Sequence, residues 1–421
     1  MPLGISDWSR LSKGNMLIVD KTAKLWELVS AYDNVFIARP HGMGKSTMCS
    51  ALYELFTHGG RYLAEANAAV YADWPEKQCY PVISLSFKHI FVGAHASEFE
   101  ASLKAAVSNA FFAAGFPEVM HFDRSEIFSG FLGKFEKIAL QHRLVVLIDD
   151  WDYPLSQSFG DQDAFALITA KLRSFYVWLG EMPNLRFVLV TGTMHYRETA
   201  TVLEGISFQD LSMDPDVVAL LGYTQEEMET VFAPYIGLAA HRQAISTEAL
   251  LHKLKLLYGG LCFDEDAAVK LYCPYSVNHF FAAVTLQSKE PYFGYYWKCS
   301  ANTKAALEAY LQQYPLEHEE LLQLVQHKFT LSYEELNLAP LCGPVSFKVL
   351  LVQAGYFALQ DIVADSEVEL APQERCYNCV VPNHEVGKEF DLLLERYLMG
   401  YNAKKWLSTE SVGIGSSPSL R

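Results

Sequence analysis

The chain has 421 residues, of which 51% are hydrophobic, 13% aromatic and 19% charged. A disordered chain would be poorer in aromatic residues and richer in charge, so this composition predicts folded domains, each with its own core. The formal net charge of −16 argues against a protein that binds nucleic acid regardless of sequence, because such proteins carry a surplus of cations.

Secretion and membrane insertion are not expected. The opening stretch MPLGISDWSRLSKG contains no apolar run of signal-peptide length. The charge-free run 271–288 includes Pro274 and several polar residues, which favours buried core over a membrane span. Eight cysteines in a chain of this length indicate reduced thiols. We therefore expect a cytoplasmic protein with no membrane segment.

The first half alternates apolar, strand-like runs with helical patterns. The strand-like runs are 34–39, 80–87, 144–148 and 185–190. Helical patterns occupy 45–56, 98–112 and 164–179. Strands separated by helices predict an α/β fold with a parallel sheet flanked by helices.

The second half is mainly helical. Thr224 and Glu227 form a capping-box pattern, and a helix at 248–258 is expected to stop at the following glycines. Between 307 and 398 we expect three helices around two short strands, 357–362 and 377–381, as in a small winged-helix-like α+β unit. The predicted domains are 1–215, an ATPase-type domain; 216–305, a helical lid; 306–400, the winged-helix-like unit; and 401–421, a flexible tail.

The strongest chemical signal is RPHGMGKST between a predicted strand and a predicted helix. It departs from the phosphate-loop pattern GxxxxGK[ST] only at Arg39, which stands at the first glycine position. The two glycines let backbone N–H groups turn toward phosphate, the lysine reaches the β- and γ-phosphates, and the serine hydroxyl binds Mg²⁺. The predicted ATP-binding residues are Arg39, Pro40, His41, Gly42, Met43, Gly44, Lys45, Ser46 and Thr47.

A second signal is LVVLIDDWD, an apolar strand that ends in carboxylates. Ligands of open α/β sheets bind at this edge, so Asp149 is the expected Walker B acid for Mg²⁺, alongside Ser46. Asp150 follows, where many ATPases have a glutamate that polarises the attacking water, and its shorter side chain is less suited to that task. The alternative for either acid is capping of a helix N-terminus.

The strand at 80–87 lies between these two motifs in the sequence, as in folds where one extra strand separates the phosphate-loop strand from the Walker B strand. The strand ending in Thr191 is then expected to be next along the sheet. Thr191 or Thr193 is placed to contact the γ-phosphate or water, as a catalytic sensor residue; the alternative is an ordinary turn at a strand end. Arg197 is a candidate for stabilising transferred-phosphate charge, although a solvated arginine is the simpler expectation.

The chain resembles the prokaryotic AAA-ATPase-like proteins, which often carry a PD-(D/E)XK-type nuclease domain behind the ATPase. The similar stretches occur in the family's order up to about Tyr397: PLGISDW, VDKT, the RPxxxGKS loop, LIDDWDYPL, TGTMHY, LLGYTQEEME, LYGGLCF, YCPYS, AGYFAL and VPNHEVGKEF. The resemblance implies a P-loop ATPase that acts on a partner or effector.

This sequence departs from the family pattern at two informative places. The family usually has LIDEYD, so Asp150 replaces a glutamate and puts hydrolysis in doubt. The nuclease normally follows the element that contains Glu385, and the roughly 35 residues after it are fewer than such a domain needs. The effector is then expected to be missing, truncated or supplied by another protein.

Three functions follow from these observations. The first is Mg²⁺-dependent ATP binding with slow hydrolysis, coupled to a partner, an effector protein or a homo-oligomer. The second is a nucleotide-gated interaction module without turnover. The third, a DNA-acting defence or mobile-element ATPase, rests only on family association and is opposed by the acidic charge.

Three weaker features have structural explanations. Cys376 and Cys379 form a single CxxC, with Cys342 and His384 as conceivable further zinc ligands, but a reduced thiol pair in a strand is the simpler expectation. Asp20 and Lys21 are expected to anchor the N-terminal segment. The aromatic run 292–297 is expected to be core or interface rather than a surface that stacks on bases.

Overall fold

The computed structural model describes residues 1–59, 74–90, 96–158, 161–194, 205–285, 293–337, 346–363 and 370–410. Its first part is a five-stranded sheet in the order β2-β3-β4-β1-β5, in which every neighbouring pair is parallel. The strands are β1 (Asn34–Ala38), β2 (Val82–Ser86), β3 (Leu144–Asp149), β4 (Leu185–Gly192) and β5 (Gln209–Asp210). All six residues of β3 are buried, as expected for a strand covered on both faces.

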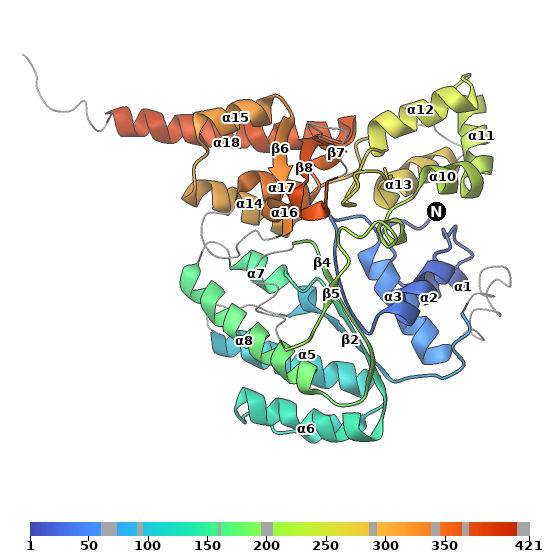
Figure 1. Cartoon of the computed structure of the whole chain (residues 1–421), viewed down its shortest axis with the longest axis vertical. Coiled ribbons are helices and arrows are strands. Elements are labelled where there is room, and N and C mark those ends of the chain that lie inside the picture. Colours follow the sequence, from blue (N-terminus) through green and yellow to red (C-terminus); the bar gives the residue numbers. More distant parts are fainter. Residues whose placement is uncertain are drawn as a thin grey trace, which may run out of the picture.

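Helices cover both faces of this sheet (Figure 1). On one side lie α1 (Trp8–Lys13), α2 (Thr22–Ala31) and α3 (Lys45–His58). On the other lie α5 (Ala96–Ala113), α6 (Phe128–Gln141) and α8 (Gln162–Glu181), with the short α7 (Tyr153–Gln157) after β3. The predicted α/β class with a parallel sheet is confirmed.

The strand order corrects one expectation. The strand that separates β1 from β3 is β4, whereas β2, which we expected in that place, forms the far edge beyond β3. The carboxyl ends of β1, β3 and β4 are therefore adjacent at one edge of the sheet, which is where ligands of parallel sheets bind. The two-residue strand β5, which the sequence did not reveal, extends the sheet beyond β1.

A helical group follows the sheet and has a core of its own, which includes Met228, Phe232, Tyr258 and Phe281. The helices are α10 (Gln225–Val231), α11 (Ala233–Arg242), α12 (Thr247–Tyr258) and α13 (Pro274–Thr285). The predicted capping box is present: the Thr224 hydroxyl accepts from the Glu227 N–H at 3.2 Å, and the Glu227 carboxylate accepts from the Thr224 N–H at 2.9 Å. The charge-free run forms buried α13, as expected.

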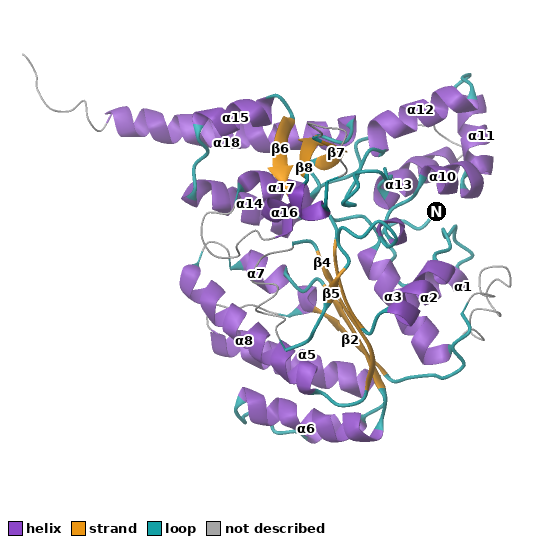
Figure 2. Ribbon diagram, viewed as in Figure 1, coloured by secondary structure: helices purple, strands orange, loops and turns teal. Residues whose placement is uncertain are grey.

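The last part contains a three-stranded antiparallel sheet in the order β6-β8-β7 (Figure 2). Its elements are α14 (Ala301–Gln313), α15 (His318–Val325), β6 (Lys328–Ser332), α16 (Tyr333–Asn337), α17 (Phe347–Ala354), β7 (Ala358–Ile362), β8 (Cys376–Val380) and α18 (His384–Glu410). Both predicted strands are present, and β6 adds a third. The order helix–strand–helix–helix–strand–strand agrees with the winged-helix-like expectation.

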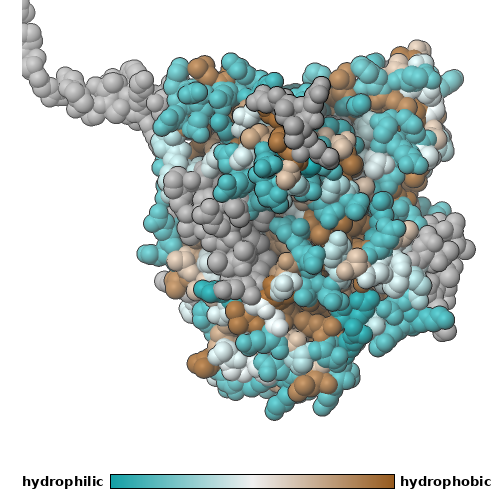
Figure 3. All heavy atoms as spheres, viewed as in Figure 1, coloured by the Kyte–Doolittle hydropathy of each residue, from teal (hydrophilic) through white to brown (hydrophobic). Residues whose placement is uncertain are grey.

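Two further differences concern boundaries. Helix α14 begins at Ala301, shortly before the predicted boundary at 306, and α18 continues through Glu410 into the predicted tail. Among the described residues no helix is both long and apolar enough to cross a membrane. The face seen in Figure 3 is mostly hydrophilic with scattered hydrophobic patches, as expected for an acidic, water-exposed surface.

Candidate functional site: a phosphate loop at the sheet edge

The loop between β1 and α3 has the backbone of a phosphate-binding turn. Gly42 and Gly44 have φ angles of +85° and +102°, in the left-handed region that favours glycine. Space is also tight at position 42, because an added Cβ would lie 3.1 Å from the Tyr275 Cβ. Gly44 is the N-cap of α3, so the positive end of this helix faces the loop.

The carbonyl groups of this loop are occupied by hydrogen-bond donors from the protein. Each one from residue 39 to residue 43 accepts a hydrogen bond. The donors are Lys45 Nζ for Arg39 and Pro40 (2.7 and 3.1 Å), Trp297 Nε1 for His41 (3.0 Å), the Tyr275 N–H for Gly42 (3.4 Å) and the Gly222 N–H for Met43 (2.9 Å). Within the described part of the chain, the N–H groups of residues 42–46 make no hydrogen bond. They are available to an anion.

Ser46 and Asp149 meet beside the loop, although they are far apart in the sequence. The Ser46 hydroxyl donates to Asp149 Oδ2 at 2.6 Å. Asp149 is 8% exposed, and burial together with the neighbouring Asp150 raises the pKa of its carboxyl group. Ser46 lines the cavity at the loop and Asp149 lies behind it. Such a pair of hydroxyl and carboxylate oxygens suits Mg²⁺, which takes one or two protein oxygens and completes its shell with phosphate and water.

Lys45 lies beneath the loop and is 7% exposed. Burial lowers the pKa of its ammonium group, while Asp149 and Asp150 oppose that shift. Its hydrogen bonds to the two loop carbonyls hold the ammonium group close to where phosphate oxygens would lie. The structure thus brings Lys45, Ser46 and Asp149 close together, as the sequence motifs predict.

The side chain of Arg39 does not face the phosphates. It is 2% exposed and donates to the carbonyls of Ala38 and Ser212, with its guanidinium 5.0 Å from the centre of the Phe263 ring. Burial lowers its pKa to about 10. Arg39 is one of the predicted ATP-binding loop residues. In the structure its side chain packs behind the loop, and its carbonyl accepts a hydrogen bond from Lys45 Nζ.

The acids after β3 are held against the end of β4. The Asp152 carboxylate accepts from the N–H groups of Thr193 and Met194, both at 3.0 Å, and the Trp151 indole donates to the Met194 carbonyl at 3.2 Å. This close approach requires Gly192, since a Cβ there would lie 2.3 Å from the Asp152 carboxylate. Burial raises the pKa of Asp152 to about 6.

Thr191 takes part in the sheet rather than in the cavity. Its side chain is fully buried, and its hydroxyl donates to the Ile37 carbonyl at 2.8 Å. This hydrogen bond joins β4 to β1 and removes the basis for the sensor contact that we expected of Thr191. Thr193 instead lines a hollow next to the loop, together with Asp150. Asp150 has a φ of +55°, which is uncommon for a residue with a side chain. It also lines a second cavity, which lies at the phosphate loop.

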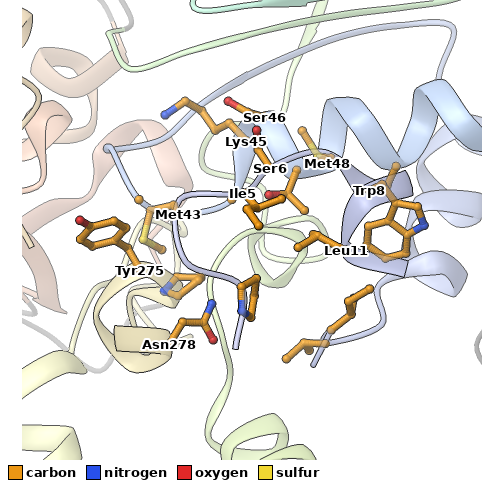
Figure 4. Close-up of a pocket in the computed structure, with 18 of the residues that line it drawn as sticks. Ile5, Ser6, Trp8, Leu11, Met43, Lys45, Ser46, Met48, Tyr275 and Asn278 are labelled. Carbon is orange, nitrogen blue, oxygen red and sulfur yellow. The ribbon is translucent and has the colours of Figure 1, made fainter. Parts of the chain in front are cut away.

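That cavity, of about 390 Å³, extends from the phosphate loop to the N-terminal segment and α13 (Figure 4). Lys45 and Ser46 lie on its polar side, while Ile5, Trp8 and Leu11 come from the N-terminal segment and Tyr275 and Asn278 from α13. Further apolar lining comes from Leu17, Ile18, Val19, Leu25 and Met48. A site with one apolar half and one anion-binding half suits a molecule with a flat base and a phosphate chain.

The weaker sequence features are placed only in part by the described residues. Lys21 donates to the Ala219 carbonyl at 2.8 Å and pairs with Glu227, which anchors the N-terminal segment. Cys376 is exposed and Cys379 buried in β8, and no cluster of three metal-binding side chains occurs among the described residues. Trp297 is buried. Cys342 and Arg197 lie outside the described residues.

Several site residues were not found from the sequence. Gly222, Tyr275 and Trp297 reach the loop from other parts of the chain, and Lys88, just after β2, lines both cavities. No local pattern marks them, because each contributes a single backbone group or side chain to a loop that lies far away in the sequence.

Residues 2–200 match the family model described as "Predicted AAA-ATPase". This region is therefore similar to the AAA-ATPase-like family. The chain is also similar to a protein of Azotobacter chroococcum mcd 1 described as "Uncharacterized protein in vnfD 5'region". The two are 25% identical over 402 residues, which is 94% of this chain and 70% of the relative. The matched family region contains the loop, Asp149 and Thr191, and it supports a nucleotide-binding, ATPase-like protein.

Proposed function

We propose that the protein binds ATP together with Mg²⁺ in the cavity at the sheet edge, hydrolyses it slowly, and passes the nucleotide state to a partner. The observation that carries this proposal is the 2.6 Å contact between Ser46 and Asp149 beside a loop with available N–H groups. Phosphate binding explains the loop, metal binding explains the oxygen pair, and the apolar half of the cavity accommodates a base.

Each residue of the phosphate end has a defined task. The loop N–H groups and Lys45 bind the β- and γ-phosphates. Ser46 and Asp149 hold Mg²⁺, which when bound withdraws charge from the phosphate oxygens. In hydrolysis, a water oxygen bonds to the γ-phosphorus while the bond to the ADP oxygen breaks. Asp150 orients this water and accepts its proton.

A second candidate is a nucleotide-gated module without turnover. It is favoured by Asp150, whose side chain is shorter than glutamate and starts from a left-handed backbone. The contacts to the loop carbonyls from Gly222, Tyr275 and Trp297 serve this function equally well, because they connect the loop to the rest of the protein whether or not ATP is cleaved.

The structure does not favour the DNA-acting function. In helix-turn-helix units the second helix enters the major groove. The helix at that place is α17, in which Phe347, Val349, Leu350, Leu351, Val352 and Ala354 are buried. Its following residue, Gly355, lies against Pro40 of the phosphate loop, with a built Cβ only 2.7 Å from the proline ring. This helix packs on protein and offers no reading surface.

Calorimetric titration of MgATP tests the proposal. The wild type is expected to bind saturably, and Lys45→Ala is expected to weaken binding at least about a hundredfold, because a buried charge contact to phosphate is lost. Lys137→Ala, which removes an exposed lysine from α6, is the matched control and should bind as the wild type does. Equal affinity in wild type and Lys45→Ala would rule out the phosphate loop as the binding site.

A further inference from the structure

The first turn of α18 is connected to the phosphate loop through one residue. Glu385 Oε1 accepts the backbone N–H of Trp297 at 2.8 Å and also that of Tyr296. The indole Nε1 of the same Trp297 donates to the His41 carbonyl at 3.0 Å. Trp297 therefore links the carboxylate at the start of α18 directly to the phosphate loop.

Both members of this connection are buried. Glu385 is 1% exposed and Trp297 3% exposed. The second carboxylate oxygen of Glu385 accepts from the Ser276 hydroxyl at 2.6 Å, so donors from two other segments of the chain converge on this side chain. None of the ion pairs formed by the described residues includes Glu385. A buried carboxylate without a cation is costly, and these donors are what offset that cost.

The Trp297 ring also fixes the space around the loop. Its Cδ1 lies 3.7 Å from where a Cβ on Gly42 would be, and its Cζ2 lies 3.5 Å from the corresponding point on Gly355. The ring meets Tyr356 edge-on at 5.5 Å. A shift of the indole would thus change both the direction of the His41 carbonyl and the room available to Gly42.

We infer that Glu385, acting through Trp297, is a positioning residue for the phosphate loop, so that nucleotide binding and the state of the first turn of α18 are linked. The inference rests on the proposed nucleotide binding at this loop. Because linkage is reciprocal, a partner that displaces the start of α18 weakens nucleotide binding, and bound nucleotide holds that turn in place.

Three single substitutions test the connection in the full chain. Trp297→Phe keeps a ring but removes the indole N–H, and Glu385→Gln removes the charge. Each is expected to lower MgATP affinity on the order of tenfold, the effect of losing one or two buried hydrogen bonds. The matched control is Trp178→Phe, since Trp178 is also buried but its Nε1 makes no hydrogen bond to the described residues; its affinity should equal that of the wild type.

A double-mutant cycle separates positioning from general damage. If Glu385 acts through Trp297, the double variant loses little more affinity than Trp297→Phe alone, whereas independent effects would add. Hydrogen exchange gives a second measure: MgATP should slow exchange at residues 385–389 in the wild type and in Trp178→Phe, but much less in Trp297→Phe.

The outcomes distinguish the two proposals. Absence of MgATP binding in the wild type would refute the proposed function itself. If the wild type binds, but Trp297→Phe and Glu385→Gln bind equally well, or their effects add, the positioning role is wrong while the proposed function stands. If Glu385→Gln does not fold, Trp297→Phe with its exchange pattern decides the question alone.

Discussion

The two halves of the cavity are built in different ways. The half proposed to bind phosphate comes from residues 41–47 and Asp150, with Asp149 bonded to Ser46, and nearly every one of these residues contributes a particular group. The apolar half is assembled from the N-terminal segment, residues 220–223 and α13, and any side chain of suitable size serves there. Phosphate and Mg²⁺ restrict residue types and spacing, whereas contact with a flat base restricts only volume. The first half accounts for the chemistry and the second for fit.

Substitution of Asp150 is expected to produce the largest effect, and only on turnover. Asp150→Asn keeps the size of the side chain but cannot accept a proton from water. Phosphate release should fall by about 10² to 10⁴-fold, the usual contribution of a general base, while MgATP affinity changes little. Phosphate release under single-turnover conditions, with calorimetric affinity alongside, measures both quantities.

The control for Asp150→Asn is a substitution of an exposed acid. Asp163→Asn removes an exposed acid from the first turn of α8 and should leave turnover unchanged. If the wild type binds ATP but releases no phosphate, or Asp150→Asn releases it as fast as the wild type, Asp150 is not the base; the first result also favours the module without turnover.

Asp152 provides the next largest effect, on stability and its pH dependence. Burial raises its pKa to about 6, above the ordinary value of 3.8. As pH rises from about 4 to above 6, the unfolded chain ionises before the folded one, so this carboxyl group lowers the free energy of unfolding progressively, by up to about 3 kcal/mol. Denaturant unfolding at several pH values should show wild type losing stability relative to Asp152→Asn over this interval.

The same comparison tells whether the effect belongs to Asp152. A stability difference between wild type and Asp152→Asn that stays constant from pH 4 to pH 7 would show that the carboxyl group titrates alike in the folded and unfolded chain. The contacts to Thr193 and Met194 would then stabilise the ionised form enough to cancel the effect of burial.

The sequence predicts the parallel sheet for physical reasons, and it also predicts which residues of the loop lie together. Strands buried on both faces show as apolar runs, and the loop chemistry fixes Gly42, Gly44 and Lys45 at set spacings. It does not give the direction of the Arg39 and Thr191 side chains, because a position within a motif does not tell which way a side chain points. It also fails to place β2 at the sheet edge, since the order of strands depends on long-range packing.

The contacts of Trp297 and Glu385 are beyond the reach of sequence patterns for a related reason. They join residues 256 and 88 positions apart, and each uses a group that is common in any buried segment. A hydrogen bond from an indole N–H to a distant carbonyl produces no recognisable residue spacing in the sequence. Only the folded structure shows that VPNHE, a stretch noted for its resemblance to the family, touches the residue that holds the loop.

The smallest expected effect lies in the apolar half and separates the two halves directly. Ile5→Ala removes three carbons that line the cavity from the N-terminal segment, which should weaken binding of ATP and ADP alike by about 1–2 kcal/mol. Because Ile5 contributes apolar contact and is no ligand of the proposed metal, the dependence of binding on Mg²⁺ should not change. The matched control is Leu3→Ala, since Leu3 is 41% exposed and does not line the cavity. Equal losses in both variants would mean that the N-terminal segment acts through folding, and a loss confined to ATP would place Ile5 at the phosphate end.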